Sequence, residues 1–232
     1  MKALQTVLIS ALALPAQADE AFEQKVIAAI MENPEVIVLA LQSLEERREA
    51  ELEEANKEII TQTEDALFGP DPAIQLVEFF DYRCGYCARA AQEHAQLPDD
   101  VKKTIKWIEL PILGDVSRDL AKVSLAVRNV EGTQAYATFR HAVFDSQGRV
   151  SSTALALQIT KQFGWDHAAI STEARSDTVA RELRDNELLA QLLDVRGTPT
   201  YVSRDQVHRG MLSNEQIIEI AERAQHPTSQ SE

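Results

Sequence analysis

The chain has 232 residues, of which 44% are hydrophobic, and its 23 basic and 37 acidic residues give a formal net charge of −14. This length allows one good-sized domain with an additional element. The negative charge disfavours nucleic acids and anionic membrane surfaces as partners, because both attract clustered positive charge. We interpret the charge as a source of solubility alone.

Residues 1–18 contain the three parts of a secretory signal peptide. Lys2 supplies the positive charge, a short apolar run follows over residues 4–14, and Ala16-Gln17-Ala18 has the small residues of a cleavage site. The alternative is an ordinary N-terminal helix or a membrane anchor, but the run is too short to span a bilayer. We therefore expect an exported, periplasmic protein that begins at Asp19 and is not embedded in a membrane.

Residues 19–66 are predicted to be helical. Asn33-Pro34-Glu35 is typical of a helix start, with an Asn N-cap, a Pro at the first helical position and an acid near the positive end of the dipole. No Gly or Pro follows until Gly69, which permits one helix of roughly 30 residues. Two interpretations compete: a solvated, Glu-rich spacer, or an oligomerisation region whose apolar stripe packs against copies of itself.

The remaining domain is predicted over residues 67–232, because Gly69, Pro70 and Pro72 end the helix. Residues 74–80 are almost continuously apolar, as in a strand buried on both faces. A helix over 88–95 follows, and residues 104–110 alternate polar and apolar like a second strand. A strand, a helix and a strand within this length predict two parallel neighbours.

The pattern is helical over residues 111–194, where several apolar stripes recur at helical spacing. A strand over 195–203 follows, residues 206–209 can pair with it as a hairpin, and a helix around Ile217 and Ala221 closes the chain. The order is βαβ, a helical insertion and ββα. This predicts an α/β protein with a thioredoxin fold, whose insertion lies between the two halves and whose N-terminal extension is helical.

Cys84 and Cys87 are the only cysteines, and Gly85 and Tyr86 separate them. A zinc site would need two further ligands, and the five histidines include no suitably spaced pair, so we expect no metal. A disulfide that closes so short a loop adds little stability. Redox chemistry fits best, because Cys84 falls where a strand gives way to a helix, and the backbone N–H groups there stabilise a thiolate. Cys84 is the expected nucleophile and Cys87 the resolving thiol, with no cofactor.

Glu78 interrupts the apolar strand six residues before Cys84. A buried carboxylate is costly unless it serves a purpose. Desolvation favours the protonated form of a carboxyl group, so Glu78 could exchange a proton with Cys87 through water. The alternative is that the side chain of Glu78 reaches the end of the sheet and is merely solvated.

Three segments together resemble the exported DsbA-like thiol–disulfide oxidoreductases: Glu78–Tyr82 with the Cys-Gly-Tyr-Cys motif, Glu109–Gly114, and Gly197–Thr200. The similarity covers about residues 67–225, and the N-terminal helices resemble those of the ScsC-like group, whose extension forms trimers. The resemblance implies a homo-oligomer, with a trimer favoured, through residues 19–66. It also implies a cis Pro199 beside the Cys84 sulfur, and a Thr198 backbone that pairs with an extended substrate segment.

Gly85-Tyr86, with Thr198 before the proline, resembles the DsbC-type isomerases. We therefore expect a disulfide isomerase or reductase in which Cys84 forms a mixed disulfide that a substrate thiol or Cys87 resolves. The resemblance implies cysteine-containing exported protein substrates and a membrane-linked reductant. Two alternatives stay open: a DsbA-type dithiol oxidase, and a non-catalytic holdase or copper-binding protein, since Cu(I) favours soft sulfur.

Overall fold

The computed structural model describes residues 17–146 and 148–225, so the predicted signal peptide lies outside the described residues except for its last two positions. The chain divides into two compact units between Leu52 and Glu53. Within the described ranges, no single helix is long and apolar enough to cross a membrane. Helices α1 and α2 together pass that test by length and composition, although they are bent by 89°.

The N-terminal helices are α1 (Gln17–Glu32), α2 (Glu35–Gln62) and α3 (Glu64–Phe68). Asn33 does not play its expected part, because its side-chain Nδ2 donates to the Ala29 carbonyl oxygen (2.9 Å) and so closes α1 rather than capping α2. The predicted helix of roughly 30 residues is present as the 28-residue α2. It ends before Thr63, whose hydroxyl donates to the Ile59 carbonyl oxygen (2.7 Å). The last ten residues of α2 belong to the second compact unit.

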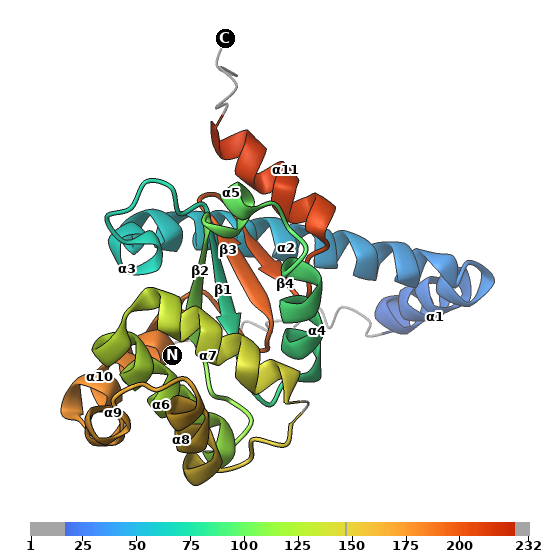
Figure 1. The fold of residues 1–232 in the computed structure, drawn as a ribbon. Helices are drawn as coiled ribbons and strands as arrows, with labels where there is room; N and C mark the ends of the chain where they lie inside the picture. Colours follow the sequence, from blue (N-terminus) through green and yellow to red (C-terminus); the bar gives the residue numbers. More distant parts are fainter. Residues whose placement is uncertain (1–16, 147, 226–232) are drawn as a thin grey trace, which may run out of the picture. The chain divides into compact units, whose positions relative to one another are not determined.

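The sheet contains β1 (Leu76–Phe80), β2 (Ile105–Glu109), β3 (Thr200–Ser203) and β4 (Val207–Arg209), in the order β2-β1-β3-β4. β1 and β2 are parallel, and the other two pairs are antiparallel. Helices α4 (Gly85–His94) and α5 (Asp99–Lys102) connect β1 to β2, and α11 (Asn214–Gln225) closes the chain (Figure 1). The predicted thioredoxin fold, with its βαβ and ββα halves, is confirmed.

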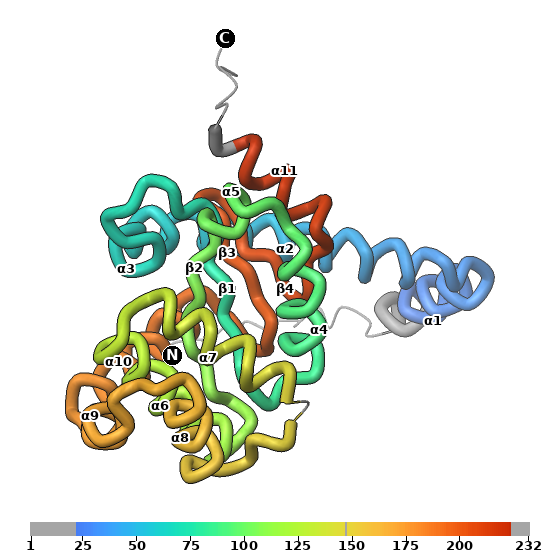
Figure 2. Tube along the Cα trace, viewed as in Figure 1, coloured from blue at the N-terminus to red at the C-terminus, as the bar shows by residue number. Residues whose placement is uncertain are grey.

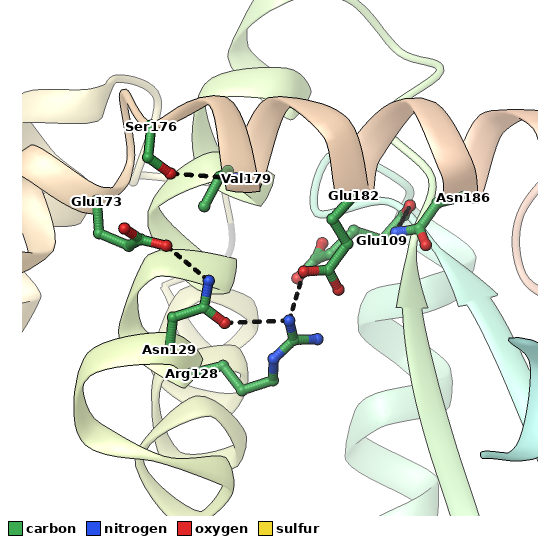
Figure 3. Close-up of polar contacts among 8 residues, drawn as sticks. All are labelled: Glu109, Arg128, Asn129, Glu173, Ser176, Val179, Glu182 and Asn186. Carbon is green, nitrogen blue, oxygen red and sulfur yellow. Dashed lines mark hydrogen bonds and ion pairs between the residues drawn. The ribbon is translucent and has the colours of Figure 1, made fainter.

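The predicted helical insertion is also confirmed. It consists of α6 (Asp115–Glu131), α7 (Thr133–Asp145), α8 (Thr153–Gln162), α9 (His167–Glu173) and α10 (Asp177–Leu192). Helix α6 packs against each of the other four (Figure 2). Polar bonds join these helices in Figure 3, where Arg128 of α6 forms an ion pair with Glu182 of α10 (2.5 Å) and Asn129 donates to Glu173 (2.8 Å). The helices of the insertion therefore pack around α6.

The two faces of the sheet carry different neighbours, because side chains alternate along each strand. On one face, Val77 and Phe79 share a core with residues of α2, α3 and α10, among them Ile60, Phe68 and Leu189. On the other face, Phe80 shares a core with Cys87 and with residues of α6 and α7. Glu78 lies between Leu76 and Phe80 in β1 and shares this second face, against which α4 packs.

Candidate active site

Asp81 fixes the turn between β1 and α4. Its carboxylate is buried, and both of its oxygens accept hydrogen bonds. One oxygen accepts hydrogen bonds from the Arg83 N–H (2.7 Å) and the Ser117 hydroxyl (2.7 Å). The other accepts from the Leu113 N–H (2.9 Å), and the Asp81 carbonyl oxygen accepts from the Cys84 N–H (3.1 Å). Asp81 thus joins the cysteine turn to the loop after β2 and to the start of α6, which holds Cys84 in a defined place.

Cys84 is the N-cap residue of α4, and Cys87 lies in the first turn of that helix. Both thiols are free. The Cys84 thiol donates to the carbonyl oxygen of Thr198 at 3.1 Å, so the loop before β3 faces the nucleophile. The Thr198-Pro199 peptide bond is cis, as the resemblance implies. The structure therefore brings Cys84, Cys87, Thr198 and Pro199 together from segments more than a hundred residues apart.

The two thiols differ in environment. Cys84 is 8% exposed and Cys87 is completely buried. Burial raises the pKa of the Cys87 thiol well above its usual value, and the nearby Glu78 carboxylate raises this pKa further. Cys87 therefore holds its proton at neutral pH and needs a base before it can attack a sulfur. This asymmetry is consistent with the roles that the sequence predicts for the two residues.

Glu78 is completely buried, so the alternative of a solvated side chain at the end of the sheet is wrong. Its Oε2 accepts from Nη2 of Arg140 at 2.9 Å, whereas its Oε1 has no hydrogen-bond partner among the described residues. Its charge acts on the pKa of Cys87, which is the neighbour that the sequence predicts for it. The proton exchange with Cys87 stays a prediction.

Sequence reasoning missed Arg140, which lies in α7 and is 1% exposed. Its guanidinium carbon is 4.6 Å from the centroid of the Trp107 ring, 4.7 Å from that of Phe80 and 5.0 Å from that of Phe144. One signal was present, because position 140 falls on the apolar stripe of its helix, one turn after Tyr136. A charged residue on a buried stripe calls for a buried partner.

A second buried carboxyl group, that of Glu109, lies at the end of β2. Burial raises its pKa from 4.5 to about 8, and its Oε1 has no hydrogen-bond partner among residues 17–146 and 148–225. Its backbone carbonyl oxygen accepts from Asn186 of α10 at 3.1 Å, which links β2 to the insertion (Figure 3). Glu109 belongs to a motif that carries the resemblance, but its burial could not be read from that motif.

The surface beside Cys84 is partly apolar. Tyr86, inside the cysteine motif, is 62% exposed, and the Arg89 guanidinium lies 5.4 Å from the centre of its ring. Ile112 and Leu113 are also exposed, and Leu113 is bonded to the turn that carries Cys84. Gly85 has open space where a side chain would begin. Among the described residues, no group of three or more His, Cys, Asp or Glu side chains is placed to hold a metal ion.

The family model for the DsbA-like thioredoxin domain matches residues 75–222. The thiol–disulfide exchange protein α-DsbA2 from Wolbachia pipientis is similar at 27% identity and a TM-score of 0.65, covering 74% of this chain and 96% of that one. No curated protein matches the chain.

Two further solved structures are similar over more of the chain. A linker-deletion mutant of Proteus mirabilis ScsC has 19% identity and a TM-score of 0.63, and covers 94% of this chain and 100% of its own. Salmonella enterica Typhimurium BcfH has 19% identity and a TM-score of 0.72, and covers 90% of this chain and 96% of its own. At this identity the two structures show a shared fold.

Proposed function

The chain belongs to the DsbA-like thioredoxin-domain family and is a thiol–disulfide oxidoreductase, and from this premise we propose that it is an exported, oligomeric disulfide isomerase or reductase. One observation carries the proposal: the slightly exposed Cys84 at the start of α4 lies against Thr198, while Cys87 is sealed beneath it. Such a pair can hold one substrate sulfur at the surface and keep a second thiol in reserve.

The first step is attack of the Cys84 thiolate on a substrate disulfide. A bond forms between Cys84 and one substrate sulfur, and the other substrate sulfur leaves as a thiolate. An extended substrate segment pairs with the backbone of Thr198 as an added strand, with Pro199 beside it. Tyr86, Ile112 and Leu113 offer apolar contacts to the residues around the substrate cysteine.

The mixed disulfide is then resolved in one of two ways. A second substrate thiol attacks the substrate sulfur, which frees Cys84 and completes an isomerisation. Alternatively Cys87 gives its proton to Glu78 and attacks Cys84, so the substrate leaves reduced and a Cys84–Cys87 disulfide remains. A membrane-linked reductant must return that disulfide to two thiols before the next reduction.

Two features favour isomerisation or reduction over oxidation. The Gly85-Tyr86 dipeptide, with Thr198 before the proline, matches the pattern of the DsbC-type isomerases. The N-terminal helices also expose a row of large apolar side chains, which supports assembly of several copies, with a trimer favoured, through residues 19–66. Several active sites facing one space would suit a misfolded, cysteine-containing exported substrate.

Reactivation of scrambled ribonuclease tests the proposal. The reduced wild-type protein is expected to restore ribonuclease activity, and Cys84→Ala is expected to abolish the restoration. No reactivation by the wild type, or full reactivation by Cys84→Ala, would overturn it.

A dithiol oxidase is the second candidate, because the same two thiols in their disulfide form can oxidise a substrate. It predicts rapid oxidation of a reduced dithiol peptide by the Cys84–Cys87 disulfide, and recovery of that disulfide from cells. The exposed apolar residues of α1 and α2 also suit a holdase, and the two thiolates suit Cu(I). Chaperone activity that persists in the double variant Cys84→Ser/Cys87→Ser would point to the holdase.

A further inference from the structure

We propose that Arg140 of helix α7 is a positioning residue for the resolving step: it holds Glu78 as a carboxylate and leaves one oxygen of that carboxylate free for the proton of Cys87. The inference rests on the proposed function, in which Cys87 resolves a mixed disulfide on Cys84. It gives the helical insertion a part in chemistry that occurs on the thioredoxin half of the domain.

The strands place Glu78 at the centre of this arrangement. Its register partners are Trp107 on β2 and Tyr201 on β3, and directly paired residues project from the same face of a sheet. Arg140 reaches this face from α7, and its Nη2 lies 2.9 Å from Oε2 of Glu78. The ion pair therefore occupies the layer between the sheet and the insertion.

The surroundings of Arg140 keep water away and restrict its orientation. Its guanidinium group lies over the rings of Phe80, Trp107 and Phe144, each within about 5 Å of a ring centroid. The side chains of Arg140 and Glu78 are 2% and 0% exposed. Arg140 has no carboxylate partner other than Glu78 among the described residues. The two charges therefore depend on each other.

The contact uses only one of the two carboxylate oxygens. Oε2 of Glu78 accepts the bond from Arg140, and the buried Oε1 has no partner within the described ranges. A carboxylate alone in such a place would take up a proton, because desolvation disfavours the charged form, whereas an opposite charge at hydrogen-bond distance favours it. Arg140 thus supplies the charge, and the unpartnered oxygen supplies the acceptor.

Three titratable or charged groups face Glu78 from the packed elements: Arg140 from α7, Cys87 from α4 and Tyr201 from β3. Burial and then the charge of Glu78 raise the pKa values of both Cys87 and Tyr201. The hydroxyl group of Tyr201 therefore keeps its proton throughout the pH range in which the protein works. Cys87 is therefore the group that gives a proton to Glu78 during catalysis.

The resolving step balances as follows. The proton of Cys87 passes to Oε1 of Glu78, the Cys87 sulfur attacks the Cys84 sulfur, and the bond between Cys84 and the substrate sulfur breaks. The substrate leaves as a thiolate with the electron pair of that bond, so the substrate is reduced and the cysteine pair oxidised. Without Arg140, no opposite charge among the described residues favours the ionised form of the buried Glu78 carboxyl group, and a protonated carboxyl group cannot accept the proton of Cys87.

Ellman's reagent separates the two steps on the full-length reduced protein. Attack by Cys84 releases one equivalent of thionitrobenzoate, and attack by Cys87 on the resulting mixed disulfide releases a second. Stopped-flow traces would be compared between pH 5 and pH 9 for the wild type, Arg140→Met, Arg140→Lys, Glu78→Gln and the double variant Glu78→Gln/Arg140→Met. The double variant removes both charges and leaves no unpaired ion in the core.

Arg140→Met is expected to leave the first phase within about twofold and to slow the second phase by about tenfold or more at pH 7, as for the loss of a general base. The second phase should recover as the pH rises, and Arg140→Lys should restore most of the neutral-pH rate. In the Glu78→Gln background, Arg140→Met should cause no further slowing.

An unchanged second phase in Arg140→Met, or equal slowing with and without Glu78, would overturn the proposal. If Arg140→Met fails to fold, the comparison of Glu78→Gln with the double variant decides: equal second phases support the proposal and a slower double variant overturns it. Failure of the proposed function looks different. It would appear as wild-type protein that shows both phases but does not reactivate scrambled ribonuclease.

Discussion

The two compact units of this chain differ in which side chains they bury and which they expose. The second unit, from Glu53 onward, buries ionisable groups as well as apolar ones, including Glu78, Glu109 and Arg140. The first unit leaves large apolar side chains exposed on α1 and the start of α2: Phe22, Val26, Ile27, Met31, Val36, Ile37, Val38, Leu39, Leu41 and Leu44. The second unit can satisfy its own core, whereas the first presents a surface that calls for a partner.

In the proposed function, chemistry belongs to the second unit and assembly to the first. The difference also divides a single helix, because the last turns of α2 carry the buried Asn56 and Ile60, whereas its first turns are exposed. The two functions should therefore be separable by changes in one unit that leave the other untouched.

The largest expected effect concerns Cys84. Cys84→Ala should lower the rate of reaction with a peptide disulfide by at least about a thousandfold, because the buried Cys87 is left as a protonated thiol. Mass spectrometry of Cys87→Ala, which keeps the nucleophile, should instead reveal a trapped mixed disulfide on Cys84. Rapid reaction of Cys84→Ala would show that Cys87 is accessible and would break the asymmetry on which the site rests.

Removal of residues 19–52 should change the mass in solution from that of an oligomer to that of one chain, because it removes the exposed apolar residues. The reaction of Cys84 with Ellman's reagent should stay within about twofold, since the site lies wholly in the second unit. Light scattering and stopped-flow measurements check the two parts. The cut belongs at residue 52 rather than at the predicted boundary of 66, because Ile60 belongs to the sheet's core. A full-length protein that is already monomeric would remove the assembly function from the first unit.

Two substitutions in α2 test the comparison within one helix. Ile60→Ala should lower the free energy of unfolding by about 2–4 kcal/mol, because the side chain is 1% exposed and its loss leaves a cavity. Leu41→Ala, at a side chain that is 59% exposed, is the matched control and should change it by less than about 0.5 kcal/mol in a monomeric preparation. Urea unfolding measures both, and equal effects would show that the helix is not divided.

The sequence was sufficient for the features that depend on local pattern. Alternation and helical spacing predicted the strands, the parallel pair and the helical insertion. The cysteine spacing at a strand-to-helix junction predicted the position of the thiols. The cis Pro199 needed the resemblance, because no local pattern distinguishes a cis from a trans proline.

The sequence was insufficient where one side chain depends on a distant segment. The ion pair of Glu78 joins residues 62 positions apart, and which element supplies the cation is decided by how α7 crosses the sheet. Asn33 shows the same limit at short range, since its side chain could bond forward to α2 or back to α1, and the bend between the helices selects α1. Patterns identify a group that needs a partner, and only packing identifies the partner.

The smallest expected effect is a change in how steeply the free energy of unfolding depends on pH, caused by Glu109. Burial raises the pKa of Glu109 from 4.5 to about 8, so between these values the unfolded chain has lost a proton that the folded chain still binds. The free energy of unfolding should therefore fall as the pH rises through this window, by at most about 1.4 kcal/mol per pH unit from this one group. Glu109→Gln should flatten that fall. In urea unfolding, the free energy of unfolding of the variant relative to that of the wild type should therefore rise from pH 5 to pH 8. Glu54→Gln, at an exposed position, should leave the slope unchanged. Parallel curves for the wild type and Glu109→Gln would show that Glu109 ionises in the folded protein, and that the second unit does not bury this carboxyl group as an uncharged one.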